Sequence, residues 1–131
     1  MSAFHLQIVT PDGSFFDGEA ERVIVRAIDG DICILPRHNP YVTELAMGEA
    51  RVTVDGKVRR AAANGGMLAV TGDKVRIVAS TFEWAEDIDK ERAARARAAA
   101  EEQMKAAKDD KELQLAKAKL MRALTRLKVS E

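Results

Sequence analysis

The sequence predicts an α+β fold in two parts: an N-terminal antiparallel β-sandwich or flattened barrel over residues 1–84, and a C-terminal antiparallel two-helix hairpin over residues 85–131. Two observations indicate this division. Turn-forming residues recur about every ten positions in the first part, which is typical of many short strands. No Gly or Pro follows Asp87, and a chain of 131 residues has room for one small domain with an appendage.

The first part is expected to consist of short, half-buried strands. The turns that separate them are Pro11-Asp12-Gly13, Asp17-Gly18, Asp29-Gly30, Asp55-Gly56, Asn64-Gly65-Gly66 and Gly72-Asp73. Between the turns, apolar and polar residues alternate, as in Val23/Val25, so one face of each strand should point inward. We expect Trp84 to cover the sandwich at its end, and Cys33 to be a small buried hydrophobic residue rather than a nucleophile.

The second part is expected to be helical. Ala, Glu, Lys, Arg and Leu dominate it, and they are strong helix formers. The dipeptide Asp109-Asp110 separates two helices at about 88–107 and 111–128, and an aspartate there can cap the second helix. Because the connecting loop is short and polar, the two helices should form an antiparallel hairpin.

The contact between the two helices can be read from spacing. The residues expected in it are Ala93, Ala96, Ala100 and Ala107 of the first helix, and Leu113, Ala116, Leu120, Ala123 and Leu127 of the second. This pattern predicts that methyl groups pack against leucines. Small side chains bury little apolar surface, so the hairpin should be marginally stable and suited to act as a switch.

Composition and motifs exclude several classes of function. The chain has 21 acidic and 21 basic residues, and no aromatic residue stands among the cations of its basic end, which argues against nucleic-acid binding. A single cysteine and the lack of an apolar run near 18 residues favour a soluble protein of a reducing compartment. No metal-ligand spacing, phosphate loop or nucleophile elbow is present, so we expect no enzyme activity.

The segment "IDKERA", residues 88–93, contains the candidate site. Asp89 and Arg92 lie three residues apart on the expected helix, and Ala93 beside them leaves space. Arg122 and Arg126 lie four apart on the second helix, so an antiparallel hairpin would bring three arginines to one end. Arginines can hold a phosphate with a planar fork of donors. The alternative is ordinary solvated ion pairs, which spacing alone favours.

Four stretches carry a family resemblance over essentially the whole chain. They are "VTPDGSFFDGEAERVIVRAIDGDICILPRHNPYVTEL", "NGGMLAVTGDKVRIVA", "EWAEDID" and "IDKERA", in this order. In them the chain resembles the epsilon subunits of bacterial rotary ATP synthases. It departs from the usual pattern at four positions, Cys33, Arg37, Asn64 and Met67, where the family commonly has Gly, Gly, Ser and Phe.

The resemblance implies a non-catalytic role in the rotor of a proton-translocating complex. The sandwich would dock on the gamma subunit and the c-ring, with Asp31, Arg37 and His38 as c-ring contacts. The hairpin would permit ATP hydrolysis when folded. Extended along gamma into the catalytic head, it would block rotation and meet the alpha and beta subunits, with Arg122, Arg126 and Lys128 contacting the head. The protein would be peripheral, on the cytoplasmic face of the bacterial cell membrane, without inserting into it.

The resemblance also implies a ligand. In relatives with the same motif, the folded hairpin binds one ATP without hydrolysing it. The matching residues are Glu83, Ile88, Asp89, Arg92, Ala93, Arg122 and Arg126. We therefore expect ATP as a regulatory ligand, while participation of magnesium stays open. A free-standing ATP-binding sensor that does not hydrolyse ATP is the alternative.

Overall fold

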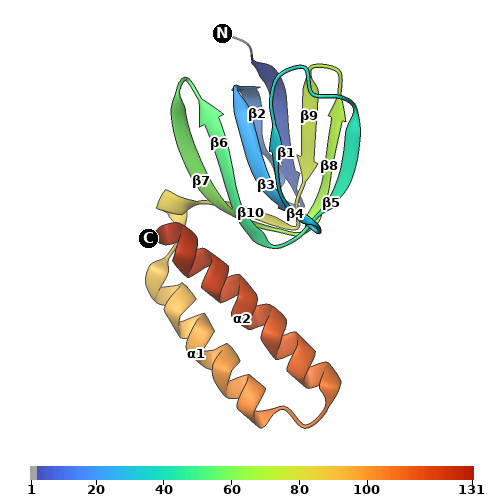
Figure 1. Cartoon of the computed structure of the whole chain (residues 1–131). Coiled ribbons are helices and arrows are strands. Elements are labelled where there is room, and N and C mark those ends of the chain that lie inside the picture. The colour runs from blue at the N-terminus through green and yellow to red at the C-terminus, as the bar shows by residue number, and fades with distance from the viewer. Residues whose placement is uncertain (1–2) are drawn as a thin grey trace. The chain divides into compact units, whose positions relative to one another are not determined.

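The computed structural model of the chain describes residues 3–131. The chain divides into two compact units between Trp84 and Ala85, at the position where the composition changes. Within the described residues, the first unit contains ten strands and the second contains a short 3-10 helix and two α-helices (Figure 1).

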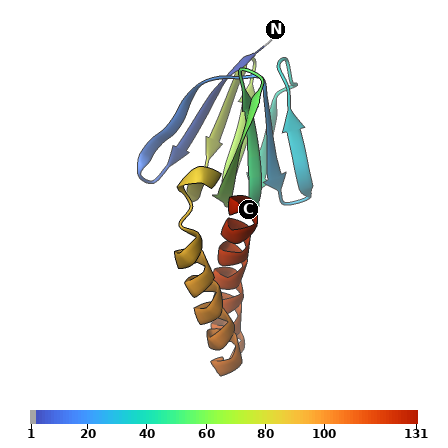
Figure 2. The same cartoon turned by 90° about the vertical axis from the view of Figure 1, so that its left-hand side faces the viewer.

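All strands of the first unit belong to one continuous sheet. They are β1 (Phe4–Thr10), β2 (Gly13–Ala20), β3 (Arg22–Ala27), β4 (Gly30–Ile34), β5 (Tyr41–Leu45), β6 (Gly48–Val54), β7 (Lys57–Asn64), β8 (Gly66–Thr71), β9 (Lys74–Val78) and β10 (Thr81–Trp84). Their order is β10-β7-β6-β3-β5-β8-β9-β1-β2, and β4 pairs with β3 beside this path. The sheet folds over on itself, which confirms the predicted sandwich or flattened barrel (Figure 2).

One pairing differs from the prediction of a purely antiparallel sheet. Strands β1 and β9 run parallel, with His5 opposite Lys74 and Val9 opposite Val78. Seven strands separate β1 and β9 along the chain, so no hairpin turn forces them to run in opposite directions. Local turn signals could not reveal this pair.

The core follows the predicted alternation. Its largest fully buried side chains are Phe4, Leu6, Ile8, Val23, Val25, Ile34, Val52, Leu68, Val75 and Ile77, which recur at every second position of their strands. Cys33 is an exception to our expectation, because it is exposed. It lies between the half-buried Ile32 and the buried Ile34 on β4, so the two-residue period turns its thiol outward.

An aromatic cluster joins the two ends of the sheet. Phe15 of β2 packs against Phe82 and Trp84 of β10, with ring centroids 5.1 and 5.3 Å apart. Phe16 meets Trp84 edge-on, at 6.1 Å. The guanidinium of Arg59 lies 3.8 Å above the Trp84 ring, within the range of a cation–π interaction. Trp84 therefore covers the end of the sandwich, as predicted, and helps to close it.

The second unit is a helical hairpin. It consists of the 3-10 turn η1 (Ala85–Asp87), α1 (Lys90–Ala106) and α2 (Asp110–Ser130), and α1 and α2 run antiparallel side by side (Figures 1 and 2). Asp109 caps α2, as expected, because its carboxylate accepts a hydrogen bond from the Glu112 N–H at 2.8 Å. The Glu112 carboxylate in turn accepts one from the Lys108 N–H at 2.9 Å. These two bonds fix the loop between the helices.

The hairpin seam is formed by four buried alanines, Ala93, Ala100, Ala116 and Ala123. The prediction that Ala96 belongs to it is wrong, since Ala96 is exposed. The seam alanines of each helix are seven residues apart, and Ala96 falls outside the face that this repeat defines. The predicted leucines are only half-buried beside the seam. Alanine therefore packs mainly against alanine, which allows the helices to approach closely.

Candidate functional site

Asp89 occupies the N-cap position of α1, not the helical face that we predicted. Its backbone is extended, and its carboxylate oxygen Oδ1 accepts a hydrogen bond from the backbone N–H of Arg92 at 3.1 Å. The helix begins only at Lys90, so the side chains of Asp89 and Arg92 are related by a cap and not by a helical turn. The side chain of Arg92 itself is exposed.

The two apolar residues of the segment are buried. Ile88 is 8% exposed and Ala93 is fully buried in the seam. The space left by the small Ala93 side chain is therefore used by the close approach of α2. Any contact of Ala93 with a ligand would have to use its backbone.

The structure brings the three predicted arginines to one side of the hairpin. Ala93 and Ala123 lie in the seam near its open end. In an antiparallel pair of helices that face each other through these alanines, the residues just before them, Arg92 and Arg122, lie on the same side. Arg126 lies one turn from Arg122, on the same face of α2. Arg92 and Arg122 are exposed and Arg126 is half-buried.

Lys128, predicted to contact the catalytic head, and Glu83, predicted to contact ATP, lie away from the three arginines on their elements. Lys128 follows Arg126 by two residues, so its side chain leaves α2 on a nearly opposite face. Glu83 is on β10 of the first unit, half-buried, opposite Ala62 of β7. Of the residues predicted to hold ATP, the hairpin unit thus contains all but Glu83.

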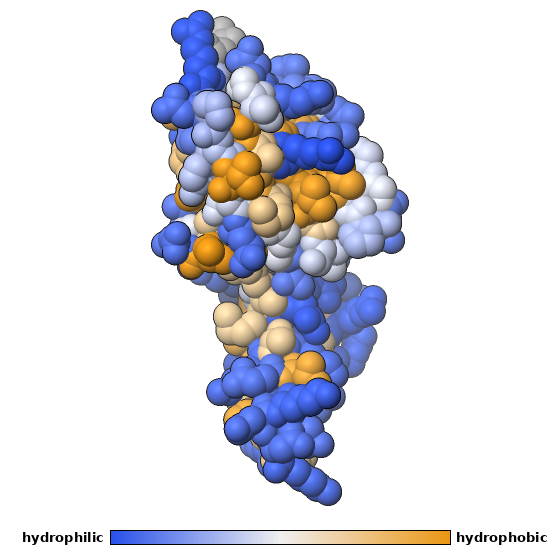
Figure 3. All heavy atoms as spheres, turned by 90° about the vertical axis from the view of Figure 1, so that its right-hand side faces the viewer, coloured by the Kyte–Doolittle hydropathy of each residue, from blue (hydrophilic) through white to orange (hydrophobic). Residues whose placement is uncertain are grey.

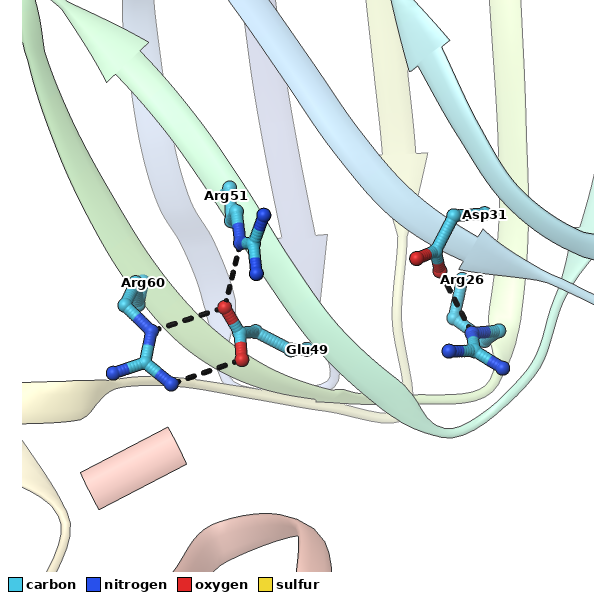
Figure 4. Close-up of polar contacts among 5 residues, drawn as sticks. All are labelled: Arg26, Asp31, Glu49, Arg51 and Arg60. Atoms are coloured by element: carbon cyan, nitrogen blue, oxygen red, sulfur yellow. Dashed lines mark hydrogen bonds and ion pairs between the residues drawn. The ribbon is translucent and has the colours of Figure 1, made fainter. Parts of the chain in front are cut away.

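The residues predicted to contact the c-ring lie on β4 and the loop that follows it. Asp31 is opposite Arg26 on β3, and the Arg26 Nε–H donates a hydrogen bond to its carboxylate at 2.7 Å (Figure 4). Arg37 has a backbone φ of 64°, a left-handed conformation that glycine adopts without strain. His38 donates from Nδ1 to the Asn39 carbonyl at 2.7 Å, and its ring lies 6.0 Å from that of Tyr41.

Sequence reasoning missed one cluster of charges on the outer face of β6 and β7. Glu49 accepts hydrogen bonds from Arg60 at 3.0 and 2.9 Å and from Arg51 at 2.8 Å (Figure 4). The hydrogen bonds from Arg60, and secondarily the one from Arg51, lower the pKa of Glu49 to about 2, although burial opposes this. Pairing β6 with β7 about the Asp55-Gly56 turn places Arg51 opposite Arg60, so the register could have revealed the cluster.

An exposed apolar row crosses the outer face of the sheet. Met67 on β8 lies opposite Val78 on β9, and Val42 on β5 lies opposite Ala69 in the adjacent row. Val42 is 64%, Met67 44% and Val78 45% exposed. The side of the molecule on which β5 and β8 lie shows apolar side chains gathered on this unit (Figure 3). Large exposed apolar patches commonly mark sites of protein–protein contact.

Two further features bear on function. Residues 3–131 contain no cluster of His, Cys, Asp and Glu that could hold a metal ion. None of the helices in the same range is long and apolar enough to cross a membrane.

Two family profiles cover the described chain. Residues 3–85 match the ATP synthase, Delta/Epsilon chain, beta-sandwich domain, and residues 86–131 match the ATP synthase, Delta/Epsilon chain, long alpha-helix domain. The chain belongs to the ATP synthase delta/epsilon chain family. Its resemblance to epsilon subunits, inferred from four sequence stretches, is thereby confirmed. The family boundary between residues 85 and 86 lies beside the boundary between the two units.

Individual proteins agree with the family assignment. The ATP synthase epsilon chain of Bacillus velezensis is 44% identical, over 99% of this chain and 98% of the relative. That of Caldicellulosiruptor bescii is 38% identical, over 100% and 96%. A chain in the Euglena gracilis mitochondrial ATP synthase structure, which contains OSCP, F1 and the c-ring, shares the fold with a TM-score of 0.84 at 21% identity, covering 95% of this chain and 79% of that one.

Proposed function

We propose that this chain is a non-catalytic coupling and regulatory subunit of a bacterial ATP synthase. The family match over both units carries the proposal. Relatives of similar length are named ATP synthase epsilon chain, and the solved complexes with this fold are described by their c-ring or central stalk. The subunit would be peripheral, on the cytoplasmic face of the membrane, held there through its partners.

The sandwich would attach the subunit to the rotor. The apolar row of Val42, Met67 and Val78 supports contact with the gamma subunit, because burial of this exposed surface would be favourable. The loop with Arg37 and His38, next to Asp31, would contact the polar loops of the c-ring. A free-standing ATP sensor, the alternative function, would gain nothing from such an exposed apolar row.

The hairpin would regulate ATP hydrolysis. Its alanine seam buries little apolar surface, so the folded hairpin is only weakly favoured by itself. A ligand that binds only the folded form stabilises it by RT ln(1 + [L]/Kd), about 2.7 kcal/mol at a hundredfold excess over Kd. ATP bound by Arg92, Arg122 and Arg126 would thus keep the hairpin folded, and its loss would release the hairpin to contact the alpha and beta subunits.

Calorimetry of the full chain with ATP, ADP and GTP tests the regulatory part. ATP should bind, and Arg92→Ala or Arg122→Ala should weaken binding at least tenfold, since each removes a charge-assisted contact with phosphate. Arg95→Ala is the matched control: Arg95 is exposed, lies two residues from the seam residue Ala93, and so points away from α2. Equal affinity for all three variants and the parent chain would reject this site.

Co-purification tests the rotor part. Residues 1–87 should bind gamma, and Met67→Glu should weaken that binding, because a charge would enter the apolar contact. A chain that binds ATP but not gamma would instead support the free-standing sensor.

A further inference from the structure

Each helix of the hairpin carries a second row of residues on the side where the three arginines lie. The row of α1 is Arg92, Ala96, Ala99 and Gln103, and the row of α2 is Leu115, Lys119, Arg122 and Arg126. Both rows have the 4-3-4 spacing of one helical face, displaced from the seam by less than a third of a turn on average. We call the surface formed by these two rows the cationic face.

Lys119 belongs to this face by the same geometry as Arg122. It lies three residues before Arg122 and is exposed. The helices are antiparallel, so residues earlier in α2 lie beside residues later in α1. Lys119 therefore lies farther from the open end of the hairpin than Arg122, in the direction that leads from Arg92 to Ala96 along α1. At the level of Lys119 the row of α1 consists of Ala96 and Ala99, so only methyl groups of α1 border the groove between the two rows there.

Three cations of the cationic face have no ion pair among the described residues: Arg92, Lys119 and Arg122. Glu91, the acid next to Arg92, leaves α1 on the side away from the seam, and the carboxylate of Asp89 caps α1. On the opposite side of the hairpin, by contrast, Arg97 is paired with Glu101 at 3.3 Å. Like charges three and four residues apart on a helix repel each other. Such a cluster is stabilised when an anion binds it.

We propose that Lys119 is a further phosphate ligand of the nucleotide site, and that the polyphosphate of the nucleotide lies along the groove between the two rows, past Ala96. The inference rests on the proposed binding of ATP to the hairpin. From Arg126 to Lys119 the cations of α2 span about 10 Å of helix axis, which suits an extended chain of phosphates better than a single phosphate. The site therefore selects nucleoside triphosphates over monophosphates by length and charge.

Calorimetry of the full chain with ATP and with inorganic tripolyphosphate tests the proposal, with Lys119→Ala compared with Lys117→Ala. Both lysines are exposed on α2, but Lys117 lies on the opposite side of the seam. Lys119→Ala should weaken both ligands about tenfold, the value expected for one charge-assisted contact. Lys117→Ala should leave both affinities within about twofold. Equal effects of the two substitutions, or a loss for ATP without a loss for tripolyphosphate, would overturn the proposal.

A second pair of variants tests the open groove. Ala96→Glu should abolish measurable binding of tripolyphosphate, because it places an anion in the groove, whereas Ala94→Glu, on the other side of α1, should not. Glutamate is a good helix former, so both variants should keep the hairpin. If the unmodified chain binds neither ligand, the proposed ATP regulation and this inference fail together. If it binds ATP but Ala96→Glu and Ala94→Glu do not differ, only this inference fails.

Discussion

The carboxylate of Asp89 accepts a hydrogen bond from the backbone N–H of Arg92, at 3.1 Å, where α1 begins. The same two residues stand in the segment that resembles a nucleotide-binding motif. One part of the motif therefore has a structural task that does not depend on any ligand. An effect of changing Asp89 on nucleotide binding has to be separated from an effect on the helix.

Replacing Asp89 by alanine should destabilise the hairpin by about 1 kcal/mol, because the first turn of α1 loses its cap. Asp89→Asn should retain most of the stability, since asparagine caps helices equally well. Hydrogen exchange of the α1 amides measures this. Comparing the ATP affinity of the two variants then separates the roles: if Asp89→Asn binds ATP as the parent does, the cap is what matters, and if it does not, the negative charge is required.

Glu49 should make the sandwich sensitive to acid. Its pKa is lowered in the folded state to about 2 from an ordinary value of 4.5, so its ion pairs stabilise the fold above about pH 5, and this stability is lost as the pH falls from 4.5 towards 2. The free energy of unfolding should fall by an amount on the order of 2 kcal/mol over this range. The Glu49 side chain is only 14% exposed, so solvent screens its ion pairs little. Urea unfolding of Glu49→Gln between pH 2 and pH 7 should show a flatter acid limb. A limb as steep as that of the parent chain would mean that other carboxylates cause it.

Arg37→Gly should stabilise the sandwich by about 0.5–1 kcal/mol, since it relieves a left-handed backbone conformation that a residue with a Cβ adopts at a cost. Asp55→Gly is the control. Asp55 has a φ of 51°, but aspartate tolerates this region better than arginine, so its gain should be smaller. Chemical unfolding at neutral pH gives both values. If Arg37→Gly also weakens c-ring binding, the strain accompanies a functional side chain.

Ala100→Leu should open the hairpin. Ala100 is 1% exposed in the seam, and a larger side chain there forces the helices apart at a cost of about 1–3 kcal/mol. Ala98→Leu, on the exposed surface of α1, should have little effect. Hydrogen exchange of α2 amides should increase in the first variant only. Equal protection in both would show that the seam does not determine hairpin stability.

Local patterns in the sequence were sufficient to predict the strands, the two helices and the residue that caps α2. Alternation places Val23 and Val25 in the core, and Asp109 stands where a polar break in a helical stretch requires an N-cap. The same period of two explains why Cys33 is exposed, whereas its residue type, which is usually buried, predicts the opposite. The parallel pairing of β1 with β9 has no local signal at all.

The candidate site was only partly predictable. Arg92 and Arg122 could be placed on one side of the hairpin from spacing and the antiparallel arrangement. All four buried alanines of the seam were among the predicted residues, but so was the exposed Ala96, because alanines are so frequent in α1 that spacing alone does not exclude it. The cationic face follows from the register of the seam, so Lys119 was not visible in the sequence.

The parallel pair of β1 and β9 has a consequence for how the chain folds. His5 and Lys74 pair although they stand near opposite ends of the first unit's sequence. One edge of β1 therefore stays unpaired until β9 has been synthesised. Contacts of such long sequence separation make folding slow, while α1 and α2 are consecutive in the chain and are joined by a short loop, so their mutual contacts span shorter sequence separations. The sandwich should therefore form slowly, and the hairpin should form much faster.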